Sequence, residues 1–146
     1  MRQVNHSLGQ RGQIAGMLGV AAPLFVLLFA LIIEVGIAGY YFLVLQRTID
    51  AAAFAAGMQL DQEAFLADDN AVQLSDNACT VVASVIAADG QGVVALTGCV
   101  PVGDTVTVTG STTAPSLFGG VLGYSGATFS WTSTAQFQTG ITEAGQ

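Results

Sequence analysis

The stretch that decides the fold is residues 12–46, GQIAGMLGVAAPLFVLLFALIIEVGIAGYYFLVLQ, in which Glu34 is the only charged residue. A bilayer hydrocarbon core of about 30 Å needs roughly 20 helical residues, so this segment is long enough to span a membrane. It also exceeds the roughly 7–15 apolar residues of a cleaved secretory signal. The sequence therefore predicts a membrane helix that is retained in the mature protein.

The apolar segment is longer than the membrane core, so we expect its helix to emerge and continue as a stalk. Residues 49–58, IDAAAFAAGM, have high helix propensity, which predicts one helix from about residue 12 to about residue 60, bent near Pro23. Arg2 and Arg11 precede the span, which places the N-terminus in the cytoplasm and the C-terminal part outside. Small residues recur at a spacing of four, at Gly12/Gly16, Ala15/Gly19, Ala52/Ala56 and Ala53/Gly57. This spacing either allows close approach of a partner helix or arises by chance, because small residues are frequent in any membrane helix.

Glu34 needs a separate explanation, because an ionised carboxylate in hydrocarbon is expensive and tends to face a partner. One reading is an intramembrane contact between Glu34 and another subunit. The other is that the span covers roughly residues 12–33 and leaves Glu34 at the outer interface, beside Tyr40 and Tyr41. The sequence leaves both readings open.

The composition excludes several classes of protein. Of 146 residues, three are basic and ten are acidic, which gives a net charge of −7. This balance is unsuited to binding nucleic acid, which needs many cations. The only histidine is His6, no basic residue follows Arg47, and the sequence contains no catalytic or metal-binding motif. We therefore expect no enzyme activity, no cofactor and no metal site. The polar segment 61–78, which contains several acidic residues, is interpreted as a solvated linker.

Beyond the linker, residues 79–87 and 92–100 are apolar and β-branched, which predicts two strands. Ala88-Asp89-Gly90 would form their hairpin loop, with Gly90 in the left-handed conformation. In that register Cys79 faces Cys99, so the pattern predicts a disulfide on the exterior side of the membrane. Two buried free thiols are the alternative.

Residues 104–109 and 129–138 alternate strictly between apolar and polar side chains, as half-buried strands do. The apolar face of the second segment, formed by Phe129, Trp131, Ala135 and Phe137, should point to the core. The sequence thus predicts an α+β fold, with a long N-terminal transmembrane and stalk helix and a small antiparallel sheet of about four strands. Its parts would be a cytoplasmic tail (1–11), the helix (12–60), the linker (61–78) and the exterior β domain (79–146).

The segment before the last strand, residues 116–124 (SLFGGVLGY), is unusually apolar for a loop. It either forms a flexible patch that touches the outer leaflet or a partner, or folds back over the open edge of the sheet. The residues concerned are Leu117, Phe118, Val121, Leu122 and Tyr124.

Four short sequence motifs follow one another in the N-terminal half: Arg11-Gly12-Gln13, Pro23, IIEVG at residues 32–36 and LQRTIDAAA at residues 45–53. This order resembles the TadE/TadG-like family of tight-adherence (Flp) pilus assembly proteins, which are of pseudopilin type. The resemblance covers about residues 11–58, and the chain length is closer to that of the short TadE-like members. The α+β order also resembles that of a pilin.

The resemblance implies a membrane-anchored component of a tight-adherence (type IVc) pilus assembly and secretion system. Such a protein would act through helix–helix and β-domain contacts with other pilus-assembly or pilin subunits, as a homo- or hetero-oligomer. It would be a single-pass protein of the bacterial inner membrane with its C-terminal domain outside, or be incorporated in a pilus. The alternative is a filament-forming pilin subunit or a membrane-tethered surface-binding or adhesion module.

Cleavage by a prepilin-type peptidase would fall between Gly12 and Gln13. Processed relatives carry a glutamate at the fifth position of the mature chain, and that position is Met17 in this sequence. Met17 cannot supply the negative charge that neutralises the N-terminal amine of a neighbouring subunit in type IV pilins. We therefore expect the chain to remain unprocessed, as an assembly factor in the membrane.

Overall fold

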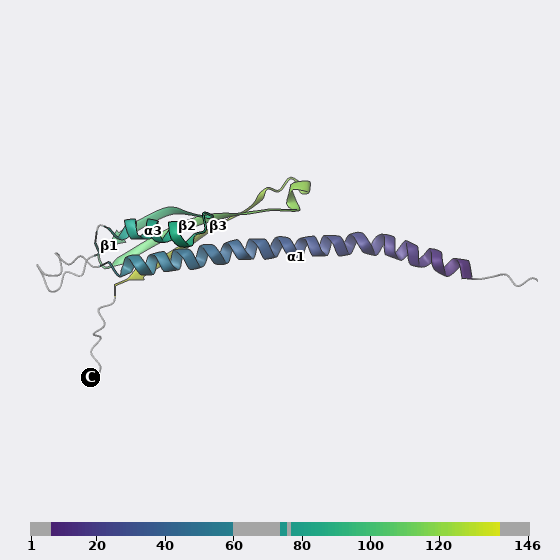
Figure 1. Ribbon diagram of the computed structural model, residues 1–146, viewed down its shortest axis with the longest axis horizontal. Coiled ribbons are helices and arrows are strands. Elements are labelled where there is room, and N and C mark those ends of the chain that lie inside the picture. Colours follow the sequence, from purple (N-terminus) through teal and green to yellow (C-terminus); the bar gives the residue numbers. More distant parts are fainter. Residues whose placement is uncertain (1–6, 60–73, 76, 138–146) are drawn as a thin grey trace, which may run out of the picture.

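The computed structural model describes residues 7–59, 74–75 and 77–137, and for residues 7–15 and 121–122 it describes the backbone alone (Figure 1). The predicted linker therefore lies mostly outside the described residues. The elements follow one another as helices α1 (Ser7–Gly57) and α3 (Ala78–Asp89), strands β1 (Val94–Val102) and β2 (Thr105–Pro115), the 3-10 turn η1 (Gly119–Leu122) and strand β3 (Gly126–Gln136). This is the α+β arrangement that the sequence predicts.

Helix α1 is the longest element, and its 51 residues run along the whole length of the molecule (Figure 1). The helix is curved, and its direction changes in the N-terminal part, which contains Pro23. Proline removes one backbone donor from the helix and clashes with the preceding turn, which accounts for a bend there. The other elements lie beside the C-terminal half of α1, and only the tip of the β2–β3 hairpin reaches past its middle, so most of the N-terminal half is bare (Figure 1).

The core lies between the C-terminal half of α1, the sheet and α3. Helix α1 contributes a stripe of buried residues at helical spacing, Leu45, Ile49, Ala52, Ala53 and Ala56. Helix α3 adds Ala78, Val82 and Ile86, and strand β2 adds Val106 and Val108. The small residues of the stalk thus pack inside their own chain, where they let the sheet and α3 approach α1 closely, and the idea that they contact a partner helix is wrong.

The sheet has three antiparallel strands in the order β1-β2-β3, where the sequence suggests about four. Strand β2 is central, with Val108 opposite Cys99 of β1 and opposite Ser133 of β3. Buried residues alternate with half-buried or exposed ones along β2, so one face of the sheet rests on the helices and the other faces outward.

The predicted first strand is wrong, because residues 79–87 belong to helix α3. A short, continuous apolar run does not distinguish a strand from a buried helix. In this chain its buried residues, Ala78, Val82 and Ile86, recur every fourth position and form one helix face. The predicted hairpin loop is therefore the end of a helix. Gly90 caps it with a φ of −73° rather than in the left-handed region, which Gln91 and Gly92 adopt instead.

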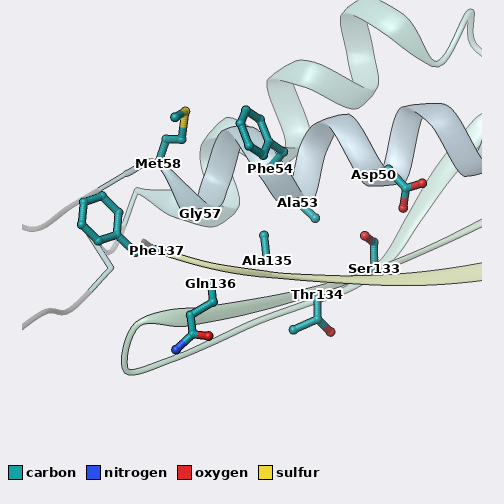
Figure 2. A pocket seen from close by; sticks show the side chains of 10 residues that line it. All are labelled: Asp50, Ala53, Phe54, Gly57, Met58, Ser133, Thr134, Ala135, Gln136 and Phe137. Carbon is teal, nitrogen blue, oxygen red and sulfur yellow. The ribbon is translucent and has the colours of Figure 1, made fainter. Parts of the chain in front are cut away.

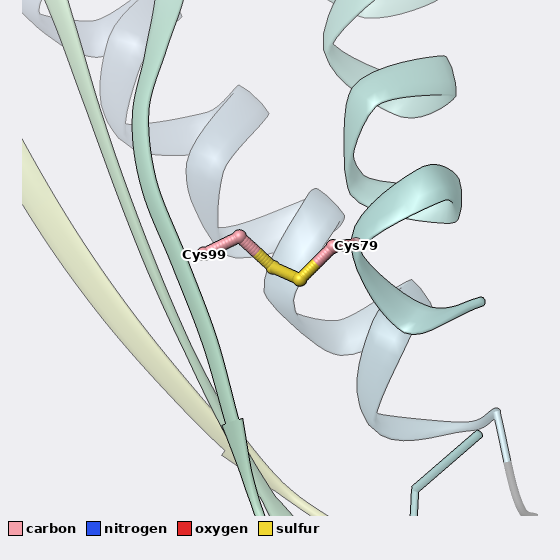
Figure 3. Close-up of a disulfide and its surroundings, with 2 residues drawn as sticks. All are labelled: Cys79 and Cys99. Atoms are coloured by element: carbon pink, nitrogen blue, oxygen red, sulfur yellow. A yellow bond between two sulfur atoms is a disulfide. The ribbon is translucent and has the colours of Figure 1, made fainter. Parts of the chain in front are cut away.

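The predicted disulfide is confirmed, although the strand pairing that led to it is wrong. Cys79 in the first turn of α3 is bonded to Cys99 in the middle of β1, and their Cα atoms are 5.9 Å apart (Figure 3). The bond ties the short helix to the edge strand that it covers.

The apolar face of β3 points to the core as predicted, and Phe129, Trp131, Ala135 and Phe137 all pack against the buried cluster. Two of these rings form edge-to-face pairs with Phe42 of α1, at centroid distances of 5.7 Å for Phe129 and 5.9 Å for Trp131. The Trp131 indole also donates a hydrogen bond to the Asp50 carboxylate, at 3.0 Å. Aromatic packing and one polar contact therefore fix β3 along the helix.

Candidate functional site

The N-terminal half of α1 is the first candidate feature, because most of its described side chains are exposed. From residue 16 to residue 33 nearly every side chain is exposed, and most of them are large and apolar. The helix is long and apolar enough to cross a membrane. Residues 12–33 would extend for about 33 Å at 1.5 Å per residue, which matches a hydrocarbon core of about 30 Å.

Glu34 lies directly after this bare segment and is bound by the apolar loop of its own chain. The Ser116 hydroxyl donates a hydrogen bond to Oε1 of Glu34. Oε2 accepts hydrogen bonds from two successive backbone N–H groups, those of Leu117 at 3.2 Å and Phe118 at 3.3 Å. We call this arrangement of Glu34 with residues 116–118 the Glu34 clamp.

The loop holds its donors in position through its own hydrogen bonds. The Gly119 N–H donates to the Ser116 hydroxyl at 2.8 Å, and the Tyr124 N–H donates to the Gly119 carbonyl at 2.9 Å. Glycine is required at position 119 because a Cβ there would lie 2.3 Å from the Ser116 hydroxyl oxygen and 2.8 Å from the Tyr124 ring. A Cβ at Gly120 would meet nothing within 4 Å. Close packing of the loop therefore depends on Gly119 and not on Gly120.

The Glu34 clamp is held by hydrogen bonds without a positive side chain. The sequence has no Lys, Arg or His after Arg47, so the sheet domain cannot offer Glu34 a salt bridge. Successive backbone N–H groups form an anion-binding concavity, and hydrogen bonds to a charged acceptor are stronger than neutral ones. The clamp thus stabilises a carboxylate beside an apolar helix segment.

An apolar cavity of about 590 Å³ lies between the tip of the β2–β3 hairpin and the bare helix. Its helix wall lies on the N-terminal side of Glu34, and its other wall comes from the loop. The lining residues are Val26, Leu27, Ala30, Leu31, Glu34, Phe118, Gly119 and Tyr124. We call this the tip cavity. The ionisable residues in this lining are Tyr124 and Glu34, and the Glu34 carboxylate already accepts the hydrogen bonds of the clamp.

A second cavity, of about 490 Å³, lies at the opposite end of the sheet, between the end of α1 and the end of β3 (Figure 2). Ala53 and Gly57 of α1 lie against Ala135 of β3 on one side of it, and Phe54 and Met58 also line it (Figure 2). Its lining includes one acid, Asp50, whose carboxylate accepts the indole hydrogen bond of Trp131. One carboxylate without a second titratable partner is not a constellation for acid–base chemistry.

The outward face of the sheet carries hydroxyl groups rather than charges. Three pairs of threonines are hydrogen-bonded across β2 and β3, Thr107 with Thr134, Thr109 with Thr132 and Thr113 with Thr128, at 3.0–3.3 Å. Within the described residues, no group of three or more His, Cys, Asp or Glu side chains could hold a metal ion. The outward face of the described sheet therefore presents hydroxyl groups to its surroundings.

The structure brings together residues that the sequence analysis treats as two separate features. Glu34, Leu117, Phe118 and Tyr124 belong to one site, because the loop neither extends freely nor folds over the sheet edge but binds the helix. Ser116 is a member of this site that the sequence does not predict, since its one signal is its place three residues before Gly119. The side chains of Gly12, Gln13, Val121 and Leu122 lie outside the described part of the structure.

Comparisons of the chain with family models, with curated proteins and with solved structures found no match.

Proposed function

We propose that this chain is a membrane-anchored, pseudopilin-like component of a tight-adherence (type IVc) pilus assembly and secretion system, as its resemblance to TadE-like proteins implies. It is a single-pass protein of the bacterial inner membrane with its sheet domain outside. It acts by binding other pilus-assembly or pilin subunits through helix α1 and the β domain.

The observation that carries the proposal is the division of α1 into two halves. Its C-terminal half supplies the core of a small antiparallel sheet, and its N-terminal half is bare, apolar and long enough to cross a membrane. A pilin-like subunit needs this division, because the bare half packs against neighbouring helices while the sheet domain stays outside the membrane.

The bare half also presents small residues that no other part of the described chain contacts. A Cβ added at Gly16 or Gly19 would meet nothing within 4 Å. In lipid, such positions let a second helix approach the backbone closely. We therefore assign the subunit contact to the face that carries Gly16 and Gly19.

Two further features favour an assembly factor over a filament subunit. Met17 occupies the position where processed relatives carry a glutamate, so the charge that would pair with a neighbour's amine is absent. Glu34, the one acid of the apolar segment, is already bound by its own chain. Neither residue is therefore suited to the ionic contact that orders subunits in a filament.

The proposal is tested by deleting the chain in the bacterium that encodes it and complementing the deletion with variants. We expect the deletion to abolish surface pili and the wild-type chain to restore them. Gly19→Leu should reduce both piliation and co-isolation with other pilus-assembly proteins, since it blocks close helix contact. Leu28→Ile, a matched change at an exposed apolar residue, should restore piliation fully.

Normal piliation of the deletion strain would overturn the proposal. Recovery of the chain as the main component of sheared filaments would instead establish the filament-subunit alternative.

A further inference from the structure

We propose that the tip of the β2–β3 hairpin enters the membrane beside α1, and that lipid acyl chains of the leaflet on the sheet side fill the tip cavity. This inference rests on the membrane anchoring in the proposed function but adds a second element that contacts lipid. It assigns the tip cavity and the exposed loop side chains to one ligand class, the hydrocarbon chains of a bilayer.

The depth of the tip follows from its position along the helix. The cavity wall on α1 runs from Glu34 back to Val26, which corresponds to about 12 Å along the axis at 1.5 Å per residue. One leaflet of a hydrocarbon core of about 30 Å is about 15 Å deep. If residues 12–33 span the core, the loop wall of the cavity lies beside the part of α1 that the leaflet surrounds. Figure 1 shows the hairpin reaching back along α1 in the direction of its N-terminus.

The side chains at the tip are those expected in a leaflet. Leu117 is 63% exposed, Phe118 is 45% exposed and Tyr124 is 50% exposed within the isolated chain. Together with the exposed helix residues they form an apolar surface that would be unfavourable in water. Phe118 and Tyr124 also line the cavity, so the same rings would contact lipid from the loop side. Tyrosine is enriched at membrane interfaces, where its ring is in hydrocarbon and its hydroxyl reaches water.

Non-helical backbone at membrane depth is tolerated only where it is buried in protein or lines a water-filled cavity, because hydrocarbon offers no hydrogen-bond partners. Five N–H groups of the tip are satisfied within the chain, which lowers the cost of placing this backbone against α1 at the edge of the leaflet while its apolar side chains enter the hydrocarbon. Those of Leu117 and Phe118 donate to Glu34, and that of Gly119 donates to the Ser116 hydroxyl. The N–H groups of Gly123 and Tyr124 donate to the carbonyls of Gly120 and Gly119. The Glu34 clamp therefore satisfies the acid of the helix and two N–H groups of the loop at the same time.

The side chains that line the cavity favour acyl chains over a second helix. Its helix wall consists of Val26, Leu27, Ala30 and Leu31, of which only Ala30 is small. Close packing of a partner helix prefers small residues, and these lie elsewhere, at Gly16 and Gly19. Flexible hydrocarbon chains fit an irregular wall of branched side chains without such a requirement.

The test uses tryptophan fluorescence and brominated phosphatidylcholine, because bromine quenches a tryptophan that it contacts. Trp131 is the only tryptophan, so a Trp131→Phe background allows single-tryptophan variants of the full chain in vesicles. The probes are Phe118→Trp and Tyr124→Trp at the tip. Leu27→Trp reports the membrane helix, and Val102→Trp reports the opposite end of the sheet, where Val102 is 68% exposed.

We expect bromine on the acyl chains to quench both tip probes severalfold more strongly than Val102→Trp, and to quench Leu27→Trp as well. If Leu27→Trp is quenched but both tip probes are quenched no more than Val102→Trp, this inference is overturned and membrane anchoring stays intact. A loss of quenching at Leu27→Trp as well would overturn both, because the helix itself would then lie outside the bilayer. Use of two tip positions guards against one substitution that disturbs the loop.

Discussion

Oε2 of Glu34 accepts a hydrogen bond from the backbone N–H of Phe118, which lies 84 positions later in the chain and 3.3 Å away. This contact joins the only acid of the apolar segment to the most apolar loop of the sheet domain. Considered alone, neither the Glu34 carboxylate nor the apolar loop has an evident partner. Together they fasten the hairpin tip to α1 at the end of its bare apolar segment.

Glu34→Gln should loosen the Glu34 clamp. Glutamine keeps one acceptor oxygen, but its NH₂ group faces the loop donors that the second carboxylate oxygen now accepts. We expect the Leu117 and Phe118 amides to lose hydrogen-exchange protection severalfold in detergent micelles, as measured by NMR. Asp50→Asn, which changes a carboxylate farther along the same helix, is the control and should leave these amides protected. Equal protection in the Glu34→Gln variant would mean that the clamp does not hold the loop.

Gly119→Ala should open the loop, while Gly120→Ala should not. The new Cβ at position 119 would collide with the Ser116 hydroxyl and the Tyr124 ring, whereas position 120 has open space. Chymotrypsin cleaves after large apolar and aromatic residues, so limited proteolysis should cut the Gly119→Ala variant at Leu117, Phe118 or Tyr124. The Gly120→Ala variant should resist cleavage at these sites as the wild type does. Resistance of both variants would argue against the close packing at Gly119.

Gly110→Ala should destabilise the core by overpacking, and Ile49→Val should relieve part of the effect. A Cβ at position 110 would lie 2.3 Å from Cδ1 of Ile49, a residue that is completely buried. Overpacking of this kind costs about 1–3 kcal/mol of unfolding free energy. Valine lacks the Cδ1 atom, so a double-mutant cycle measured by urea unfolding should show a favourable coupling between the two changes. Additive effects would contradict the contact.

Reduction of the Cys79–Cys99 disulfide should lower the unfolding free energy by about 3 kcal/mol, given the 20-residue separation of the two cysteines. The bond holds α3 against β1, so its loss should expose the side of the core that α3 covers. Urea unfolding with and without reductant measures the difference, and the Cys79→Ser/Cys99→Ser variant should match the reduced wild type. An unchanged midpoint on reduction would show that α3 docks without the bond.

Asp104 should make the sheet less stable in acid. Hydrogen bonds from the Gln136 side chain (2.6 Å) and the Thr105 hydroxyl (3.1 Å) lower the pKa of its carboxyl below the ordinary value of 3.8. Because the pKa of Asp104 is lower in the folded state than in the unfolded state, its carboxylate contributes fully to the free energy of unfolding above the unfolded-state pKa. This contribution is lost as the pH falls through the folded-state pKa. The stability gap between wild type and Asp104→Asn, followed by urea unfolding against pH, should be constant near neutrality and close in acid. A gap that persists in strong acid would contradict the assignment.

The features that sequence predicts well here are those carried by a strong local pattern. The long helix follows from one uninterrupted apolar run, and the core face of β3 follows from the alternation that includes Phe129 and Trp131. The cysteine pattern also predicts the disulfide partners, although through the wrong element. Residues 79–87 are rich in β-branched side chains, which favours a strand, but the spacing of Ala78, Val82 and Ile86 buries one face of a helix.

The Glu34 clamp could not be predicted in the same way, because it depends on tertiary placement. Its donors are backbone N–H groups, which every residue but proline possesses, so the sequence of the loop does not mark them. Ser116 and Gly119 are the only side-chain signals, and a serine three residues before a glycine is common. The register of β2 and β3 brings the loop to Glu34, and that register depends on the packing of the whole sheet on α1.

The central claim is that this chain remains in the membrane as an unprocessed assembly component, and the most direct test is the intact mass of the chain purified from its native membranes. We expect a chain that starts at Met1 and is recovered with the membrane fraction. A chain that starts at Gln13 and is recovered in sheared filaments would contradict it.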